Sequence, residues 1–169
     1  GWETERYGTL FSQGALGSQP GFACFMSHNT TNGSYALTVQ TRNTQNQTVE
    51  LCTGAETLRT DGRWHHVAYT YDLGAGVARL YLDGKVVDAN TDPAKMVDPS
   101  LTWYIPVTLG GRSGEYSMMG ELAYATLWNR AITESEVDFT RRHPVSGTEA
   151  GLIGCWSLDG GDAGLLDGV

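Results

Sequence analysis

Residues 61–88 read DGRWHHVAYTYDLGAGVARLYLDGKVVD, and this stretch decides the fold class. Within it, a strand is predicted at residues 64–72, because Val67, Tyr69 and Tyr71 alternate with smaller or polar side chains, the period of a half-buried β-strand. Trp64, Val67, Tyr69 and Leu80 are predicted to be core residues. An Asp-Gly pair at 83–84 lies between two more alternating segments, residues 78–82 and 85–89. Because Asp-Gly tolerates the positive φ angles of a type I′ turn, these two segments are predicted to form a hairpin with a two-residue loop.

Period-two alternation continues on both sides of this stretch and predicts further strands. Glycine, asparagine, aspartate or proline stands in nearly every interval between them, as turn chemistry requires. So many short strands favour two packed antiparallel sheets, because a single sheet of that size would leave an apolar face bare. The further strands are predicted at residues 7–13, 21–27, 35–41, 48–53, 104–109, 120–128 and 152–158.

One segment has the signals of a helix instead. Thr133 and Glu136 have the spacing of a capping box, in which each side chain satisfies the backbone amide of the other residue. The basic residues at 141–143 suit the negative end of the helix dipole, and Pro144 prevents the helix from continuing. We therefore predict an all-β chain with one short helix near residues 133–142.

The bulk composition limits the class of protein. A length of 169 residues is enough for one sizeable core, so we predict a single domain over residues 1–169. A formal net charge of -8 argues against a nucleic-acid surface, which needs clustered lysine and arginine. No apolar run approaches the roughly 20 residues that cross a bilayer, so no membrane span is expected.

The quoted stretch also resembles the central signature of laminin G-like domains, at residues 61–72 and 78–85. Residues 152–158 look like the closing strand of this family and of the related pentraxins. The resemblance covers roughly residues 7–159 and implies a two-sheet antiparallel β-sandwich, the concanavalin A-like jelly roll. Three further segments follow in the family's order, at residues 109–112, 120–122 and 127–132.

The resemblance also implies that something is missing at the N-terminal edge. The family opens with two or so strands before the segment that resembles residues 8–14, and here seven residues precede it. We therefore expect a domain that lacks the family's first strands and is excised from a larger protein. A missing strand leaves an open edge, which a strand-donating partner segment can fill by strand addition.

Two groups of residues could suggest metal binding or catalysis, but a structural role explains each of them better. Adjacent His65 and His66 on a strand point to opposite faces, so they cannot readily share a metal ion. Glycosidases with this sandwich carry alternating acids on one strand face, whereas Glu121 is followed by apolar residues. Glu134 and Glu136 belong to the capping turn. The sequence therefore predicts a protein that is not an enzyme.

Calcium binding is expected at the C-terminal end. Asp159, Asp162 and Asp167 lie in an acidic, glycine-rich loop, and Ca²⁺ takes six to eight oxygen ligands from such loops. The resemblance adds that related domains often place a structural calcium near this edge. The alternative is a flexible acidic tail without an ion.

Carbohydrate binding is expected in the loops near residues 110–111. Sugar sites in such sandwiches stack aromatic rings on pyranose faces and fix hydroxyl groups with nearby polar side chains. The alternative for each aromatic ring is packing on the sandwich edge. The irregular loop at residues 90–103 is a further candidate. The predicted carbohydrate-binding residues are Trp103, Tyr104, Arg112, Glu115 and Tyr116.

Three sequons favour an extracellular, secreted or cell-surface location, because Asn29, Asn32 and Asn46 each stand two residues before serine or threonine in a polar, turn-like stretch. Cys24 and Cys52 fall on strands predicted to flank residues 35–41, too far apart for a disulfide.

Two functions remain open. The first is a non-catalytic carbohydrate-recognition module of a larger secreted or surface protein. The second is a structural or adhesion domain whose partner is an extracellular protein, within a polymer or matrix.

Overall fold

A computed structural model describes residues 6–14, 19–29, 34–54, 62–99, 106–111, 117–118 and 120–158. Strands dominate these ranges, and they are joined by one short 3-10 helix, η1, and one α-helix, α1. The elements are β1 (Arg6–Gly14), β2 (Gly21–Asn29), β3 (Ser34–Arg42), β4 (Thr48–Cys52), β5 (Val67–Asp72), β6 (Val77–Leu82), β7 (Lys85–Asn90), η1 (Pro93–Lys95), β8 (Thr108–Leu109), β9 (Tyr124–Trp128), α1 (Glu134–Arg142) and β10 (Leu152–Ser157).

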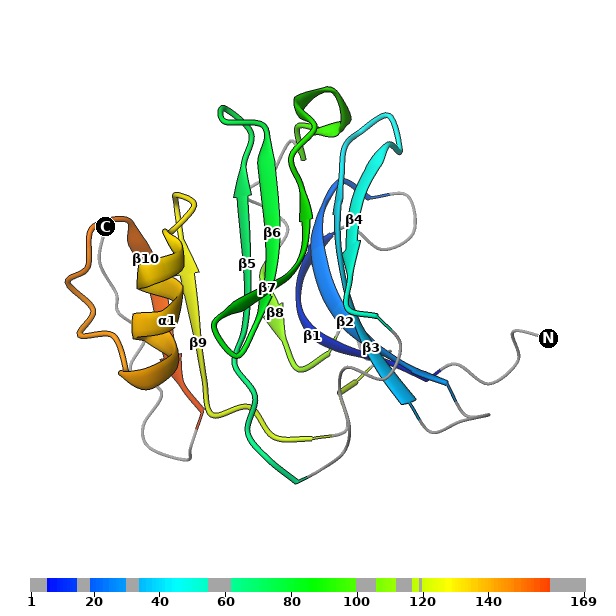
Figure 1. The fold of residues 1–169 in the computed structure, drawn as a ribbon. Helices are drawn as coiled ribbons and strands as arrows, with labels where there is room; N and C mark the ends of the chain where they lie inside the picture. The colour runs from blue at the N-terminus through cyan, green and yellow to red at the C-terminus, as the bar shows by residue number, and fades with distance from the viewer. Residues whose placement is uncertain are drawn as a thin grey trace.

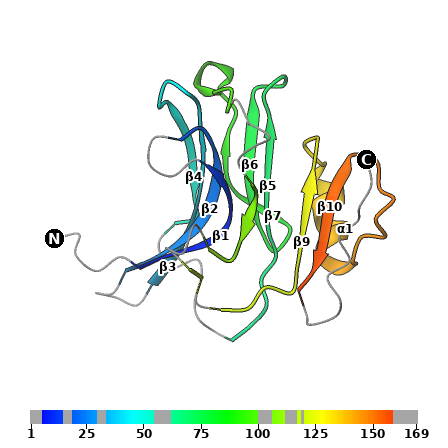
Figure 2. The same cartoon turned by 180° about the vertical axis from the view of Figure 1, so that it is seen from behind.

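The strands form antiparallel sheets that pack in two layers (Figure 1). One layer is a five-stranded sheet with the order β4-β3-β2-β1-β8. The three-stranded sheet β5-β6-β7 packs against it. The antiparallel pair of β9 and β10 is seen beside β5 (Figures 1 and 2). The predicted all-β sandwich with one short helix is therefore confirmed.

The core lies between the five-stranded and the three-stranded sheet. In β4 the alternation of the sequence decides which side chains enter it: Val49 and Leu51 are buried, while Thr48 and Glu50 face solvent. Period-two patterning thus places one apolar face of each sheet against the other. The buried cluster consists of Cys24, Leu37, Val39, Val49, Leu51, Ala78, Leu80, Leu82 and Val97.

The Asp-Gly hairpin between β6 and β7 is confirmed. Asp83 has a φ of 52° and Gly84 a φ of 80°, the two positive angles that a type I′ turn requires. The Asp83 carboxylate accepts hydrogen bonds from His65 Nδ1 at 2.9 Å and from the His66 amide at 2.9 Å. These two histidines are therefore tied to the hairpin, which supports the structural role predicted for them.

The helix α1 begins where the capping box predicted. The Thr133 side chain accepts a hydrogen bond from the Glu136 amide, and the Glu136 carboxylate accepts one from the Thr133 amide. Val137 is buried and packs with Tyr81 and Trp128, so α1 covers the outer face of the β5-β6-β7 layer and of β9. Two layers of strands and one covering helix result.

The prediction that Trp64 lies on a strand and in the core is wrong, because β5 begins at Val67 and the Trp64 side chain is 64% exposed. His65 and His66 are bonded to Asp83 instead, and β5 is the last described strand on its side of the three-stranded sheet. Trp64 therefore has no described strand beside it to pack against.

Cys24 and Cys52 lie on β2 and β4, which flank β3 as predicted. Cys24 is buried and Cys52 is exposed, and both thiols are free. Burial raises the pKa of the Cys24 thiol, so this side chain behaves as a small apolar core residue.

Candidate functional site

A polar groove runs between the edges of the two sheets. It has a volume of about 530 Å³ and lies where β4, the end of β7 and the loop that contains η1 meet (Figure 1). The lining side chains come from three segments that are far apart in the sequence. They are Gln47, Thr48, Val49, Glu50, Leu51, Asp88, Ala89, Asn90, Ala94, Lys95, Met96 and Val97.

The β4 wall is positioned by the turn that precedes it. Asn43 Oδ1 accepts hydrogen bonds from the amides of Gln45 and Gln47, at 3.0 and 2.9 Å, which fixes the β3–β4 turn. Asn43 Nδ2 also donates to Gln47 Oε1 at 2.9 Å and thereby orients the Gln47 side chain. Glu50 is held from the other side, because Gln40 Nε2 donates to its carboxylate at 2.5 Å.

Asp88 joins the two sheet edges. Its Oδ2 accepts a hydrogen bond from the Cys52 amide at 2.9 Å, so a β7 side chain satisfies a backbone group at the edge of β4. Its Oδ1 accepts one from the Ala89 amide at 2.8 Å. Both oxygens of this carboxylate therefore have backbone partners, and the two sheet edges are tied together beside the groove.

Tyr71 anchors the loop that forms the third wall. Its hydroxyl donates to the Val97 carbonyl at 2.6 Å and accepts from the Val97 amide at 2.9 Å. Burial raises the pKa of Tyr71, so the hydroxyl stays neutral and keeps its proton for this bond. Gly76 supports the loop from below: a Cβ at this position would lie 2.6 Å from the Pro93 ring.

The loop itself is ordered by short-range hydrogen bonds. Asn90 Nδ2 donates to the Asp92 carbonyl at 3.2 Å, and Asp92 Oδ1 accepts from the Ala94 amide at 3.1 Å as the cap of η1. Lys95 extends from this turn with its Nζ 3.6 Å from Asp92 Oδ2. Its ammonium is largely exposed and faces the same solvent as the groove.

The groove therefore offers hydrogen-bond acceptors, donors and one cation within a single concave surface. Glu50 contributes a carboxylate, Asn90 an amide and Lys95 an ammonium group. This set suits a ligand rich in hydroxyl groups, which both donate and accept hydrogen bonds. The described lining contains no aromatic ring. Among the residues that the structure describes, no group of three or more His, Cys, Asp or Glu could hold a metal ion.

Both sets of predicted site residues lie outside the described part of the chain. The predicted carbohydrate-binding residues are Trp103, Tyr104, Arg112, Glu115 and Tyr116, and the predicted calcium ligands are Asp159, Asp162 and Asp167. Of the loop at 90–103, the described part reaches residue 99, and Asn90 and residues 94–97 line the groove, while a functional role for the loop stays a prediction.

Two of the three sequon asparagines fall on described backbone. Asn46 lies in the exposed β3–β4 turn with a φ of 64°, and its Oδ1 accepts a hydrogen bond from Arg42 at 2.7 Å. Asn29 is the last residue of β2, and Asn32 lies outside the described residues.

Sequence reasoning missed the β4 wall and Asp88. Thr48 and Glu50 could have been placed on a solvent-facing side from the alternation of β4 alone. Nothing in the sequence indicates that the edges of β4 and β7 meet, because this depends on how the two sheets are stacked. A groove between layers is therefore visible only in the folded chain.

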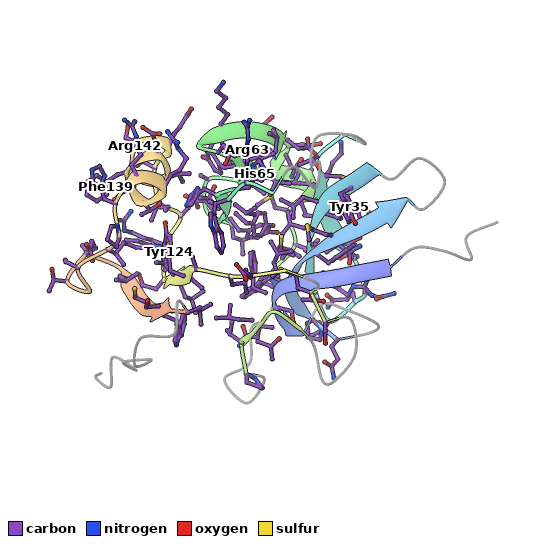
Figure 3. The ribbon with its side chains drawn as sticks, turned by 90° about the horizontal axis from the view of Figure 1, so that it is seen from below. Tyr35, Arg63, His65, Tyr124, Phe139 and Arg142 are labelled. Atoms are coloured by element: carbon purple, nitrogen blue, oxygen red, sulfur yellow. The ribbon has the colours of Figure 1, made fainter. Side chains whose placement is uncertain are left out.

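A second group of polar and aromatic residues lies near the start of β5, on β9 and on α1 (Figure 3). Figure 3 shows Arg63 and His65 near the start of β5, Phe139 and Arg142 on α1, and Tyr124 on β9. Phe139 is 51% exposed and stacks on His143 with a ring-centroid distance of 4.6 Å. This region forms a surface rather than a pocket.

Comparison with known proteins gives the family. Residues 3–138 match a laminin G family model described as the concanavalin A-like lectin/glucanases superfamily. The chain belongs to this family.

Among curated proteins, the chain is similar to neuronal pentraxin-1 of Homo sapiens and of Rattus norvegicus, with 32% identity over 83 residues in each case. These matches cover 46% of this chain and 19% of the relative, so the chain matches about a fifth of the length of these relatives.

Two solved structures have a similar course of the chain at 17% sequence identity. The CBM40 of the Ruminococcus gnavus IT-sialidase, bound to alpha2,6 sialyllactose, gives a TM-score of 0.49, with 69% of this chain and 62% of that chain covered. An S-layer domain-containing protein of Clostridium thermocellum gives a TM-score of 0.36, with 83% of this chain and 65% of that chain covered.

Within the described ranges, no helix has the length and apolar character needed to cross a membrane.

Proposed function

We propose that this protein is a non-catalytic carbohydrate-recognition module, and that the groove between β4 and β7 is its binding site. The observation that carries the proposal is the meeting of Glu50, Asn90 and Lys95 in one concave polar surface formed by three separate segments. The family description, which names lectins, supports a sugar as ligand. The same description names glucanases, so the absence of catalysis is part of the proposal.

The hydrogen bonds of the groove support binding rather than catalysis. Glycoside hydrolysis needs two carboxyl groups that are free to act on the glycosidic bond. Both oxygens of Asp88 accept backbone hydrogen bonds, and Glu50 is held by Gln40. Of the two carboxylates in the described lining, Asp88 is thus committed to the backbone, and Glu50 alone faces a ligand, whereas glycoside hydrolysis uses a pair.

A glycan array probed with residues 1–169 tests the proposal. We expect binding that is at least tenfold weaker in Glu50→Gln and Lys95→Ala, because each change removes one charged partner of the ligand. Glu134→Gln, an equal change in the exposed first turn of α1, is the matched control and should bind normally. An array without any binder would contradict the proposal. A loss of binding in Trp103→Ala with normal Glu50→Gln would move the site to the predicted aromatic loops.

Structural calcium at Asp159, Asp162 and Asp167 belongs to the same proposal. An ion that binds only the folded chain must raise its unfolding temperature, by an amount that grows with ion concentration. Thermal unfolding with CaCl₂, with MgCl₂ as control, measures this. No calcium-dependent shift would contradict the site.

An extracellular or cell-surface location within a larger secreted protein is likewise proposed, and the sequons support it. Asn46 is the most direct test, because it lies in an exposed turn. Secreted expression in eukaryotic cells should yield a glycan at Asn46 that peptide mass spectrometry detects and that Asn46→Gln removes. An unmodified Asn46 in secreted material would contradict its use.

The alternative function is structural or adhesive, with an extracellular protein as partner. The exposed Trp64 side chain, 64% exposed, is the feature that supports it, because a large apolar ring on the surface can anchor a protein partner. The two functions can be distinguished by cross-linking residues 1–169 to cell-surface extracts and resolving the products by size-exclusion chromatography, which detects any protein bound to the chain. A protein partner lost in Trp64→Ser, with no glycan binder, would favour assembly.

A further inference from the structure

The adjacent histidines His65 and His66 hold the segment before β5 against the β6–β7 turn. The Asp83 carboxylate accepts hydrogen bonds from the His65 ring and from the His66 amide, both at 2.9 Å. The Asp83 amide donates a third bond to the His66 carbonyl at 2.8 Å. Since β5 begins at Val67, these bonds to a single residue fix a segment that belongs to no strand.

The ring of His66 is not part of this arrangement. Its Nδ1 atom is buried, and within the described part of the chain it makes no hydrogen bond. In the neutral ring the proton can reside on Nε2, which leaves only a lone pair at Nδ1. Protonation adds an N–H group at Nδ1, and a buried donor without an acceptor is costly. The surroundings of His66 therefore favour the neutral ring.

His65 responds to a proton in the opposite sense. Its Nδ1 lies 2.9 Å from Asp83 Oδ2, so a positive charge on the His65 ring strengthens an existing hydrogen bond. Two neighbouring histidines thus oppose each other: acid favours the contact of His65 and disfavours the position of His66. The response of the segment to acid therefore depends on the His66 ring.

The charged groups that face the His66 ring come from two elements. The β6–β7 turn contributes Asp83, and α1 contributes Arg141. The turn and the helix are in close contact, because a Cβ on Gly84 would lie 3.0 Å from Arg141 Nε. Lys85 follows this turn as the first residue of β7 and adds another cation.

The carboxylates on this side of the molecule are already shared. Asp138 accepts hydrogen bonds from both Arg141 and Arg142, so it does not neutralise the two guanidinium groups completely. Asp83 uses both of its oxygens for the histidine segment. A proton on His66 would therefore add a cation where no described carboxylate is left to pair with it.

The electrostatics give the pH range. Burial lowers the pKa of His66 from its ordinary value of 6.5, Asp83 opposes this shift, and Arg141 adds to it. The released segment therefore binds a proton more tightly than the folded one, so the stability of the contact is present above pH 6.5 and is lost as the pH falls below it. Burial opposes the charge of Asp83, but hydrogen bonds outweigh it and keep its pKa below 3.8, so this carboxylate stays ionised.

We propose that His66 is a pH-sensitive latch, whose protonation at mildly acidic pH releases residues 62–66 from the β6–β7 turn while the sandwich stays folded. The sandwich is retained because the buried cluster between the sheets contains no histidine. Trp64 lies on the released segment and is 64% exposed. A partner that binds through Trp64 would therefore meet a fixed surface at neutral pH and a loose one in acid.

Amide exchange at two pH values tests the latch, with each rate corrected for the intrinsic effect of pH on exchange. Between pH 7.5 and 5.0 we expect the protection of the His66 and Asp83 amides to fall by about fivefold or more, because the open segment takes up the proton that the closed one excludes. Leu80, which is fully buried in the core, should keep its protection.

Two variants remove the titrating group. His66→Phe keeps a ring at this position but takes up no proton, so the protection of the Asp83 amide should no longer depend on pH. His66→Gln repeats the test with a smaller polar side chain. His143→Gln is the matched control and should keep the full response, because the His143 ring stacks on the exposed Phe139.

Three results would overturn the proposal. The first is protection of the parent that does not change between the two pH values, and the second is an equal change in the parent and in both His66 variants. The third is a loss of Leu80 protection at the same pH, because the domain would then unfold as a whole. Glycan binding in the β4–β7 groove is measured separately and does not depend on any of these results.

Discussion

The two sides of the sandwich are closed in different ways. On the β4–β7 side, Asp88 of one sheet bonds the backbone of β4, and Tyr71 fixes the loop at Val97 with two hydrogen bonds. On the β5–β9 side, the described residues of the two strands share no ladder, and Ala68 and Trp128 contact the same cluster beneath α1. The first side carries a polar groove, whereas the described strands of the second side are not hydrogen-bonded to each other.

The difference shows what a sheet edge needs. An edge that must stay free of other chains is sealed when side chains satisfy its backbone groups, as Asp88 does for the Cys52 amide. An edge without such partners remains ready to pair. We therefore expect the closed side to govern the stability of residues 1–169 and the open side to contribute less.

Truncation of one leucine on each side tests this contrast with the largest effect. Leu80→Ala should lower the free energy of unfolding by about 2–5 kcal/mol, because Leu80 is fully buried and its removal leaves a cavity. Leu127→Ala, on the half-buried inner face of β9, should cost about 1 kcal/mol. Urea unfolding measures both. Equal losses would mean that the open side is packed as tightly as the core.

Removing the loop anchor should have the next largest effect. Tyr71→Phe deletes the hydroxyl that both donates to and accepts from the buried Val97 backbone, and should cost about 1–3 kcal/mol. Amide exchange at Val97 should accelerate, while exchange in β2 stays as it is. Unchanged exchange at Val97 would show that the loop is held without Tyr71.

Loss of the helix cap should weaken the open side. Thr133→Ala removes the acceptor of the Glu136 amide and should cost about 1 kcal/mol. Because Val137 of α1 packs against Trp128 of β9, amide exchange in β9 should accelerate more than amide exchange in β4. Ser135→Ala, in the same turn, is the control. If both variants behaved alike, the cap would not be what anchors the helix.

The smallest expected effect is a pH dependence at α1. Hydrogen bonds from Arg130, and then from the Thr133 amide, lower the pKa of Glu136 from 4.5 to about 2. A lowered pKa in the folded state adds stability that is present above pH 4.5 and is lost as the pH falls toward 2.

The Arg130–Glu136 pair is exposed, so solvent screens it and its contribution to stability should be small. Unfolding curves of the parent and of Glu136→Gln should therefore converge between pH 4.5 and 2. Parallel curves over this range would contradict the pairing.

Local patterns in the sequence predicted most of the fold. Asp83 and Gly84 specify their turn by backbone conformation, and Thr133 with Glu136 specifies the helix start by short-range hydrogen bonds. Such features need no knowledge of the other layer. Trp64 was wrongly placed in the core for the opposite reason, since the segment before β5 is held by hydrogen bonds from His65 and His66 to Asp83, 18 and 17 positions away.

The groove, like the position of Trp64, could not be predicted from local sequence patterns. Its walls come from Gln47–Leu51, Asp88–Asn90 and Ala94–Val97, and their meeting depends on the stacking of two sheets. The irregular loop at 90–103 was predicted as a candidate because loops often carry function, and part of it lines the groove. Glu50 and Asp88 look like ordinary solvated strand residues in the sequence. Their role as groove walls follows only from tertiary structure.

The position of Asp83 affects how the β6–β7 turn and the segment before β5 unfold locally. Its positive φ builds the β6–β7 turn, while its carboxylate bonds His65 and the His66 amide. Burial opposes the charge, but the hydrogen bonds from His65 and His66 outweigh it and lower the pKa of Asp83. One residue thus ties a turn to a segment 17 positions earlier. Fraying of the hairpin and release of residues 62–66 are therefore a single cooperative event rather than two independent ones.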